Sequence, residues 1–293
     1  MAEAGVAEAP RRRSVQCASP KGLHRMSYLE WGDARNRDVV VCVHGLTRNA
    51  RDFDDLARAL CSTFRVVCPD VAGRGDSDRL ADPKHYALPH YVADMVTLIA
   101  RLDVEAVSWL GTSMGGLIGM ALAAQAGSPV KRLVLNDAGP VVSLVSLQRI
   151  AAYVGNAPLF PTIEQAEAYV RTICAPFGAH SDAQWRQMTE SYMKKSEEGW
   201  RPNYDPRIAE PYREAMPDKD LELWQVYDAV RCPTLVLRGE QSDLLSAQTT
   251  REMASRGPKA RVFTVKGVGH APSLMHEDQI SVVREFLMEG EAP

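Results

Sequence analysis

Short apolar runs alternate with amphipathic stretches over much of the chain. The run Val39–Val43 is apolar at every position, which is typical of a strand buried on both faces of a parallel sheet. Between residues 88 and 102, Val92, Met95 and Ile99 recur at helical spacing and predict one long helix. Strands that alternate with helices predict an α/β fold whose parallel sheet is covered on both faces.

The same pattern gives residue ranges for the other elements. We expect about eight strands, at 14–19, 24–31, 39–43, 64–69, 104–110, 132–136, 233–238 and 261–265. We expect the helices that flank them at 52–61, 88–102, 117–124, 247–254 and 278–288.

The pattern changes between residues 140 and 227, where the chain is helical in character and rich in Tyr, Trp and Phe. We interpret this stretch as a helical cap inserted into one α/β core, which comprises 14–139 and 228–293. Residues 1–13, rich in Ala and Glu, are expected to form a disordered tail.

Composition narrows the class of protein. Hydrophobic residues make up 45% of the 293 residues, and the net charge is -3, so nothing suggests a nucleic-acid partner. The chain shows no secretory signal and no apolar run long enough to span a membrane. Its six cysteines follow no metal or disulfide spacing, which favours free thiols and a cytoplasmic location. The sequence leaves open whether the protein forms homo-oligomers.

The strongest chemical motif is Gly111-Thr112-Ser113-Met114-Gly115. It lies between a predicted strand and a predicted helix, where a sharp turn lifts a serine hydroxyl above the sheet edge. Its glycines let neighbouring backbone segments approach closely. The simpler interpretation is a glycine-rich turn with an incidental serine, but the strand-to-helix setting favours Ser113 as a catalytic nucleophile.

A serine nucleophile needs a base, and an acidic residue to orient that base. His270 follows the last predicted strand and is the expected base. Asp243, after the strand 233–238, is our preferred acid, although an Asp in this setting also commonly caps a helix. Asp137, after the strand 132–136, is the competing acid.

The order His44-Gly45, Ser113, Asp243, His270 resembles the α/β-hydrolase superfamily over nearly the whole chain after residue 14. The resemblance implies a mostly parallel sheet beneath a cap, and an oxyanion hole built from the backbone N–H groups of Leu46 and Met114. It implies no metal and no organic cofactor. Candidate substrate-binding residues follow the strand 39–43: His44, Gly45 and Arg48. We interpret the glycine-rich stretch 70–77 as loop architecture, with Arg74 as a second candidate contact, beside Arg48, for a substrate carboxylate.

These residues predict hydrolysis of a small or medium carboxylic ester through an acyl-enzyme on Ser113. Similar small bacterial hydrolases include enol-lactonases and 3-hydroxybutyrate oligomer hydrolases, and the motifs do not separate them. Carbon–carbon bond hydrolases and acyltransferases share the same triad. A non-catalytic small-molecule binder on the same scaffold is a further alternative, although such a binder would normally have lost a member of the triad.

Overall fold

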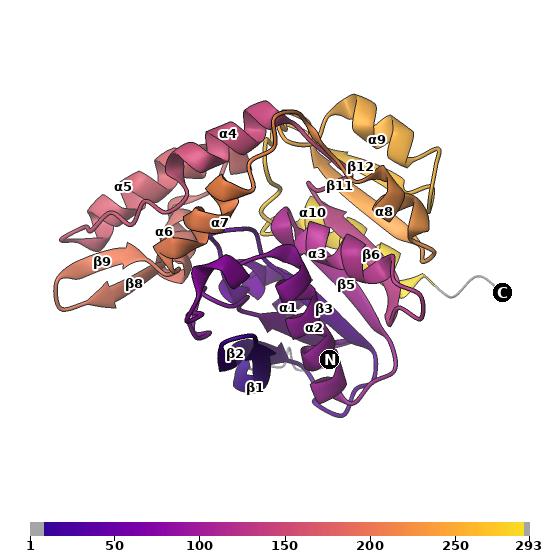
Figure 1. Cartoon of the computed structure of the whole chain (residues 1–293), viewed down its shortest axis with the longest axis horizontal. Coiled ribbons are helices and arrows are strands. Elements are labelled where there is room, and N and C mark those ends of the chain that lie inside the picture. The colour runs from indigo at the N-terminus through magenta and orange to yellow at the C-terminus, as the bar shows by residue number, and fades with distance from the viewer. Residues whose placement is uncertain (1–8, 290–293) are drawn as a thin grey trace, which may run out of the picture.

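The computed structural model describes residues 9–289 and contains one large sheet flanked by helices (Figure 1). Its eight strands lie in the order β1-β2-β4-β3-β5-β6-β11-β12. β1 and β2 are antiparallel to each other, β2 is antiparallel to β4, and the pairs from β4 to β12 are parallel. The predicted α/β class and the mostly parallel sheet are therefore confirmed.

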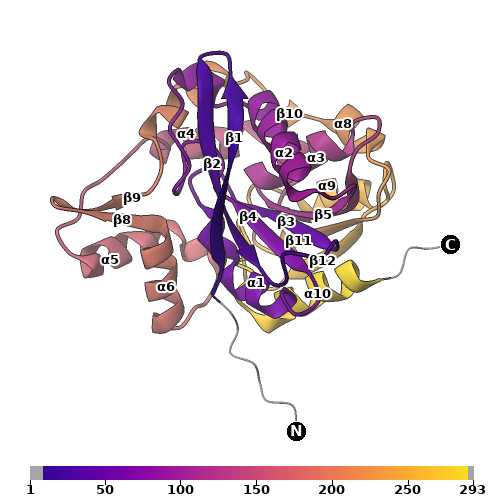
Figure 2. The same ribbon diagram turned by 90° about the horizontal axis from the view of Figure 1, so that it is seen from below.

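The strands fall close to the expected ranges. They are β1 (Arg11–Ser19), β2 (Gly22–Trp31), β3 (Val39–Val43), β4 (Arg65–Pro69), β5 (Val107–Thr112), β6 (Val130–Asn136), β11 (Thr234–Gly239) and β12 (Arg261–Val265). Figure 2 shows β1 and β2 as one long twisted hairpin with a helix, α2 (Leu88–Leu102), beside it.

Alternate residues of the central strand β3 face two different cores. Val39, Val41 and Val43 belong to the cluster that also contains Ile118, from α3 (Met114–Ala123). Val40 and Cys42 pack instead with apolar residues of α1 (Asp54–Leu60) and α10 (Glu277–Met288). A strand covered on both faces must be apolar at every position, which explains the uninterrupted valine-rich run.

The segment between β6 and β11 lies mostly to one side of the sheet (Figure 1). Its helices are α4 (Leu144–Tyr153), α5 (Ile163–Ile173), α6 (Asp182–Tyr192), α7 (Ala209–Glu214) and α8 (Trp224–Ala229), with short 3-10 turns at Ala175–Phe177 and Pro206–Ile208. It also contains strands that the pattern did not predict, namely β7 (Val141–Val142), β8 (Met193–Ser196), β9 (Gly199–Pro202) and β10 (Leu221–Glu222). We call residues 140–227 the inserted segment.

The remaining elements match with small shifts. A 3-10 turn at Ala50–Phe53 precedes α1, another lies at Pro83–His85, and α9 covers Ala247–Met253. α3 begins at Met114, three residues before the predicted start at Leu117, because the chain turns into the helix directly after Ser113. Within residues 9–289, no helix is long and apolar enough to cross a membrane.

The prediction that residues 1–13 form a disordered tail is wrong for residues 11–13. Arg11, Arg12 and Arg13 are part of β1 and pair with residues 28–30 of β2. Ion pairs from Arg11 and Arg13 to the buried Glu30 provide the reason, since they give the basic run a fixed partner. Residues 1–8 of the expected tail lie outside the described residues.

Candidate active site

Ser113 occupies a strained turn between β5 and α3. Its φ and ψ are 52° and -113°, a backbone conformation that a non-glycine residue rarely adopts. A Cβ atom on Gly111 would lie 2.1 Å from the Gly115 carbonyl oxygen, and one on Gly115 would lie 2.0 Å from that of Val43. Glycine at these positions therefore permits the turn, as the motif predicted.

His270 lies beside this serine. Its Nε2 is 3.0 Å from Ser113 Oγ, so the hydroxyl can donate its proton to the neutral ring. The imidazole comes from the loop after β12, and its side chain is 16% exposed. It is thus accessible to a substrate while the surrounding residues hold its orientation.

The acid that contacts this histidine is Asp137, directly after β6. His270 Nδ1–H donates to Asp137 Oδ2 over 2.6 Å. The fully buried carboxylate also accepts from Gly239 N–H at 3.0 Å and from the Ser242 hydroxyl at 2.6 Å. Three donors fix both oxygens and set the tautomer that leaves Nε2 free to accept a proton.

The prediction that Asp243 is the acid of the site is wrong. Its carboxylate forms a paired contact with Arg149 of α4, at 2.7 Å to Nε and 3.0 Å to Nη2. The loop after β11 turns so that the preceding residue, Ser242, reaches Asp137, and the next side chain points outward. Asp243 is half-exposed at this position.

Sequence reasoning missed two residues that hold the site together. Ser242 accepts the N–H groups of Leu244 and Leu245, which orients its hydroxyl toward Asp137. Asn136 donates to Thr112 Oγ1 at 3.0 Å and to the Pro272 carbonyl at 2.9 Å, so it joins the serine turn to the His270 loop. A signal for Asn136 existed, because polar residues at the carboxyl end of a parallel strand commonly face the functional edge of the sheet.

His44 does not line the cavity, contrary to our expectation of a substrate contact. Its buried ring donates from Nδ1 to the Gly45 carbonyl at 2.8 Å and accepts the Val71 N–H at Nε2 over 2.9 Å. Burial lowers the pKa of His44 to about 3, so the ring stays neutral and fixes the loop after β3.

Arg74 supports a loop, as we interpreted its stretch of the sequence, and the alternative role as a substrate contact is wrong. It is 1% exposed and donates to the carbonyls of Leu46 and Ala72 and to the Tyr91 hydroxyl, at 2.7–2.8 Å. Its guanidinium therefore supports the loop that carries Leu46, behind the site. Gly45 and Leu46 themselves line the cavity beside Ser113.

Arg48 does line the cavity, but its charge is already engaged. It contacts Asp52 through Nη2 at 2.6 Å and stacks over the Tyr192 ring at 4.9 Å. Burial disfavours its charge, yet the Asp52 carboxylate keeps the pKa of Arg48 above its ordinary value. Arg48 thus joins the core loop to α6 of the inserted segment.

A cavity of about 640 Å³ opens above Ser113 and His270. Core loops form one side, and the inserted segment forms the other. The apolar lining from the inserted segment includes Ile150, Tyr153, Ile173, Phe177 and Met188. Such a volume suits a small organic molecule, with its reacting group placed at the polar floor.

The charged side chains of the cavity are largely paired. Arg48 is held by Asp52, Arg51 by Asp54, and Arg149 by Asp243. The last pair is the most open, with side-chain exposures of 45% and 52%. Arg149, at 45% exposure, and Arg51, at 50%, are therefore the cavity cations that an anionic ligand could reach, and Arg149 is the one whose paired carboxylate is exposed as well.

The geometry supplies a nucleophile, a base and an orienting carboxylate in sequence. Met114 begins α3, and the N–H groups in the first turn of a helix have no partners within the helix. A carbonyl oxygen near Ser113 would therefore meet the positive end of the helix dipole. The arrangement can carry out nucleophilic attack on a carbonyl carbon.

Comparisons with known proteins agree with this fold. Residues 38–277 match the family model described as alpha/beta hydrolase fold. A 3-hydroxybutyrate-oligomer hydrolase of Cupriavidus necator is 50% identical over 285 residues, which cover 94% of this chain and 97% of the relative.

Two solved structures are similar over almost their full length. An alpha/beta hydrolase from Novosphingobium aromaticivorans is 38% identical with a TM-score of 0.86, covering 97% of this chain and 99% of that one. A putative hydrolase from Rickettsia typhi is 32% identical with a TM-score of 0.89, covering 96% and 100%.

Proposed function

Because the chain is a hydrolase that belongs to the alpha/beta hydrolase family, we propose that it cleaves carboxylic esters through a covalent intermediate on Ser113. One observation carries the proposal, namely the continuous hydrogen-bonded series Ser113–His270–Asp137, with contacts of 3.0 and 2.6 Å. A serine hydroxyl is a weak nucleophile, and this series is what activates it.

The first half-reaction forms an ester on the enzyme. His270 Nε2 takes the Ser113 proton as Oγ bonds to the substrate carbonyl carbon, and Asp137 stabilises the resulting imidazolium. The backbone N–H groups of Leu46 and Met114 hold the oxyanion, each contributing about 3 kcal/mol to the transition state. The carbon–oxygen bond to the leaving alcohol then breaks, and that oxygen receives the proton from His270.

Water completes the cycle. His270 removes a proton from a water molecule as its oxygen attacks the acyl carbon, and the Ser113 oxygen leaves with that proton. The products are a carboxylic acid and the free enzyme. Every step uses groups of this chain, with Arg74 holding the Leu46 loop in place.

We extend the proposal to esters of hydroxyacids, with oligomers of 3-hydroxybutyrate as the leading substrate. The support is the relative of that name, which is 50% identical. Such an oligomer has short apolar units, ester links and one free carboxylate. The apolar cavity suits the units, and Arg149 at its exposed edge suits the carboxylate.

The direct test is a fluorophosphonate probe followed by peptide mass spectrometry. We expect one adduct, on Ser113, and expect none in Ser113→Ala. A panel of neutral short-chain esters, lactones and 3-hydroxybutyrate oligomers then ranks the substrates by kcat/KM. Labelling at another residue, or turnover by Ser113→Ala, would overturn the serine mechanism.

The carboxylate assignment has a test of its own. Arg149→Gln should raise KM for a 3-hydroxybutyrate trimer roughly tenfold, since about 1.4 kcal/mol corresponds to that factor. The same variant should leave KM for a neutral p-nitrophenyl ester nearly constant. Equal effects on both substrates would show that Arg149 shapes the cavity without recognising a carboxylate.

A further inference from the structure

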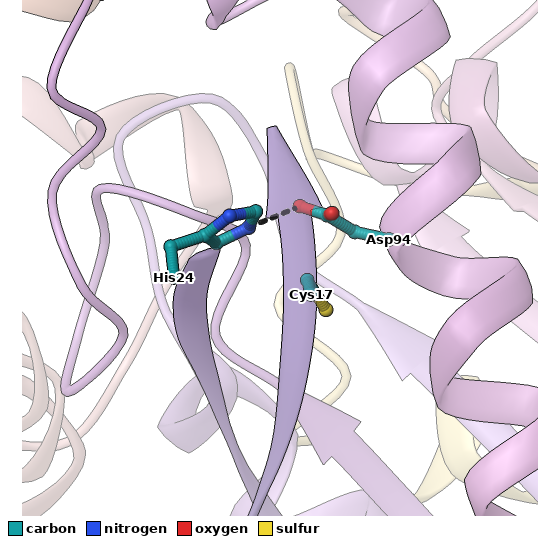
Figure 3. Close-up of side chains that lie close together, drawn as sticks. All are labelled: Cys17, His24 and Asp94. Atoms are coloured by element: carbon teal, nitrogen blue, oxygen red, sulfur yellow. Dashed lines mark hydrogen bonds and ion pairs between the residues drawn. The ribbon is translucent and has the colours of Figure 1, made fainter. Parts of the chain in front are cut away.

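A second polar cluster lies apart from the cavity, between the β1–β2 hairpin and α2 (Figure 3). Cys17 and His24 face each other across the hairpin, and Asp94 approaches from the helix. One potential ligand atom from each lies within 4.8 Å of the other two, and all three residues are buried. Cys, His and Asp are the residue types that bind zinc-like ions.

The nitrogen atoms around this cluster are incompletely satisfied. His24 Nε2 contacts Asp94 Oδ2 at 3.0 Å, but His24 Nδ1 is buried with no hydrogen-bond partner among residues 9–289. His90, one turn before Asp94 on α2, has a buried Nε2 that likewise lacks one. That Nε2 lies 3.8 Å from the same Asp94 oxygen. A ring nitrogen left without a partner in the interior is costly, and of these two it is His90 Nε2, beside Asp94, whose position a ligand at the cluster would explain.

The charges of the cluster are also unusual for a protein core. Asp94 is 1% exposed, and the ion-pair partners found for it are His24 and His90, which carry charge only when protonated. A divalent cation bound to one thiolate and one carboxylate forms a neutral group. A neutral group is far less costly to bury than a lone carboxylate.

We propose that Cys17, His24 and Asp94 form a structural binding site for a zinc-class divalent cation, with His90 Nε2 as the fourth ligand. Tetrahedral zinc places neighbouring ligand atoms about 3.3–3.8 Å apart. The His90–Asp94 contact already has this length, whereas the ligand atoms of Cys17, His24 and Asp94 lie within 4.8 Å of one another and would have to move closer around the metal.

Binding moves protons in a defined way. Cys17 loses its thiol proton to solvent as sulfur bonds to the metal. The proton that the neutral His24 ring donates from Nε2 to Asp94 is lost from that nitrogen and replaced by one on Nδ1, so that the ring stays neutral and Nε2 can bind the metal. Without metal, burial and the nearby Asp94 carboxylate raise the pKa of Cys17 to about 12.

The site would join elements distant in sequence. It would tie the edge hairpin, β1 and β2, to α2, which packs beside that hairpin (Figure 2). This role is structural, since the four proposed ligands lie outside the cavity lining found in residues 9–289.

Cobalt provides the test, because a thiolate bound to Co²⁺ gives a charge-transfer absorption and a tetrahedral site gives intense visible bands. The full-length protein, stripped with a chelator, is titrated with Co²⁺ and then with Zn²⁺. We expect one equivalent of Co²⁺ to bind and to give both absorptions, and Zn²⁺ to displace the Co²⁺. Metal binding should also raise the thermal midpoint of unfolding. Cys17→Ser should lose the charge-transfer absorption, whereas Cys232→Ser, a matched control elsewhere in the fold, should keep it.

His90→Gln distinguishes the fourth ligand. It should keep the charge-transfer absorption and weaken the visible bands, because water would replace one nitrogen. Absence of Co²⁺ binding by the wild type, or charge-transfer absorption that persists in Cys17→Ser, would overturn the proposal. The cluster would then be a hydrogen-bonded packing unit alone. Spectra and thermal midpoints give these outcomes independently of esterase activity.

Discussion

Two histidine–aspartate pairs in this molecule serve as a natural comparison. His270–Asp137 lies at the carboxyl edge of the sheet beside a serine, and His24–Asp94 lies under the edge hairpin beside a cysteine. The first histidine is 16% exposed and faces a cavity, whereas the second is 4% exposed. Similar side-chain chemistry therefore occurs once in an accessible site and once in a closed one.

The difference shows that backbone placement decides reactivity. Ser113 is lifted by a turn with φ of 52°, which directs its hydroxyl to both the base and the cavity. Cys17 lies within a regular strand, paired with His24 in the hairpin register. A thiol there has no route to a substrate, and its raised pKa removes the thiolate that nucleophilic attack needs.

Separate replacement of Ser113 and Cys17 should give the largest difference in kcat. Ser113→Ala should lower kcat on a neutral ester about 10⁵- to 10⁶-fold, because the covalent step is lost. Cys17→Ser, measured in the same assay, should change kcat little. A large loss of kcat in a folded Cys17→Ser protein would break the comparison.

The two aspartates should show opposite signatures. Asp137→Asn should reduce kcat about 10⁴-fold by upsetting the tautomer of His270. Asp94→Asn should leave kcat near wild type and reduce the free energy of unfolding by about 1–3 kcal/mol, since a buried partner of His24 is altered. Steady-state kinetics and chemical denaturation measure both quantities.

Asp243→Asn is the control that separates the two acids considered from the sequence. It disturbs only the half-exposed pair with Arg149, so we expect less than a tenfold change in kcat. A large loss of kcat in Asp243→Asn, with kcat retained in Asp137→Asn, would contradict the series Ser113–His270–Asp137.

Removal of the Ser242 hydroxyl, which supports Asp137, should lower kcat moderately. Ser242→Ala removes one of the three donors to Asp137, and we expect kcat to fall about tenfold with KM nearly constant. Ser281→Ala, on the exposed surface of α10, is the matched control. A change in KM alone would indicate that Ser242 acts on substrate binding.

The smallest effect should be chemical modification of Cys17. Its pKa of about 12 keeps the thiol neutral through neutral and mildly alkaline pH. We expect iodoacetamide to modify the more exposed Cys61 in the native protein, and Cys17 only after denaturation. Peptide mass spectrometry of both samples checks this, and rapid native alkylation of Cys17 would contradict its closed setting.

The local pattern was sufficient for much of the fold. Uninterrupted apolar runs identify strands that are covered on both faces, and helical spacing identified α2 from Leu88 to Leu102. The pattern did not predict the hairpin β8–β9, because its strands are only four residues long and partly exposed in the inserted segment. Short pairings of this kind depend on neighbours far along the chain.

The sequence by itself determined that Ser113 lies between a strand and a helix and that glycine flanks it. It also identified His270 in the loop after the last strand of the sheet. Only the tertiary structure decided between Asp137 and Asp243, because β6 and β11 are neighbours and both carboxylates follow their carboxyl ends. Ser242 and His270 both bond to Asp137, whereas Asp243 turns outward to Arg149. These contacts join segments more than 90 residues apart in the sequence.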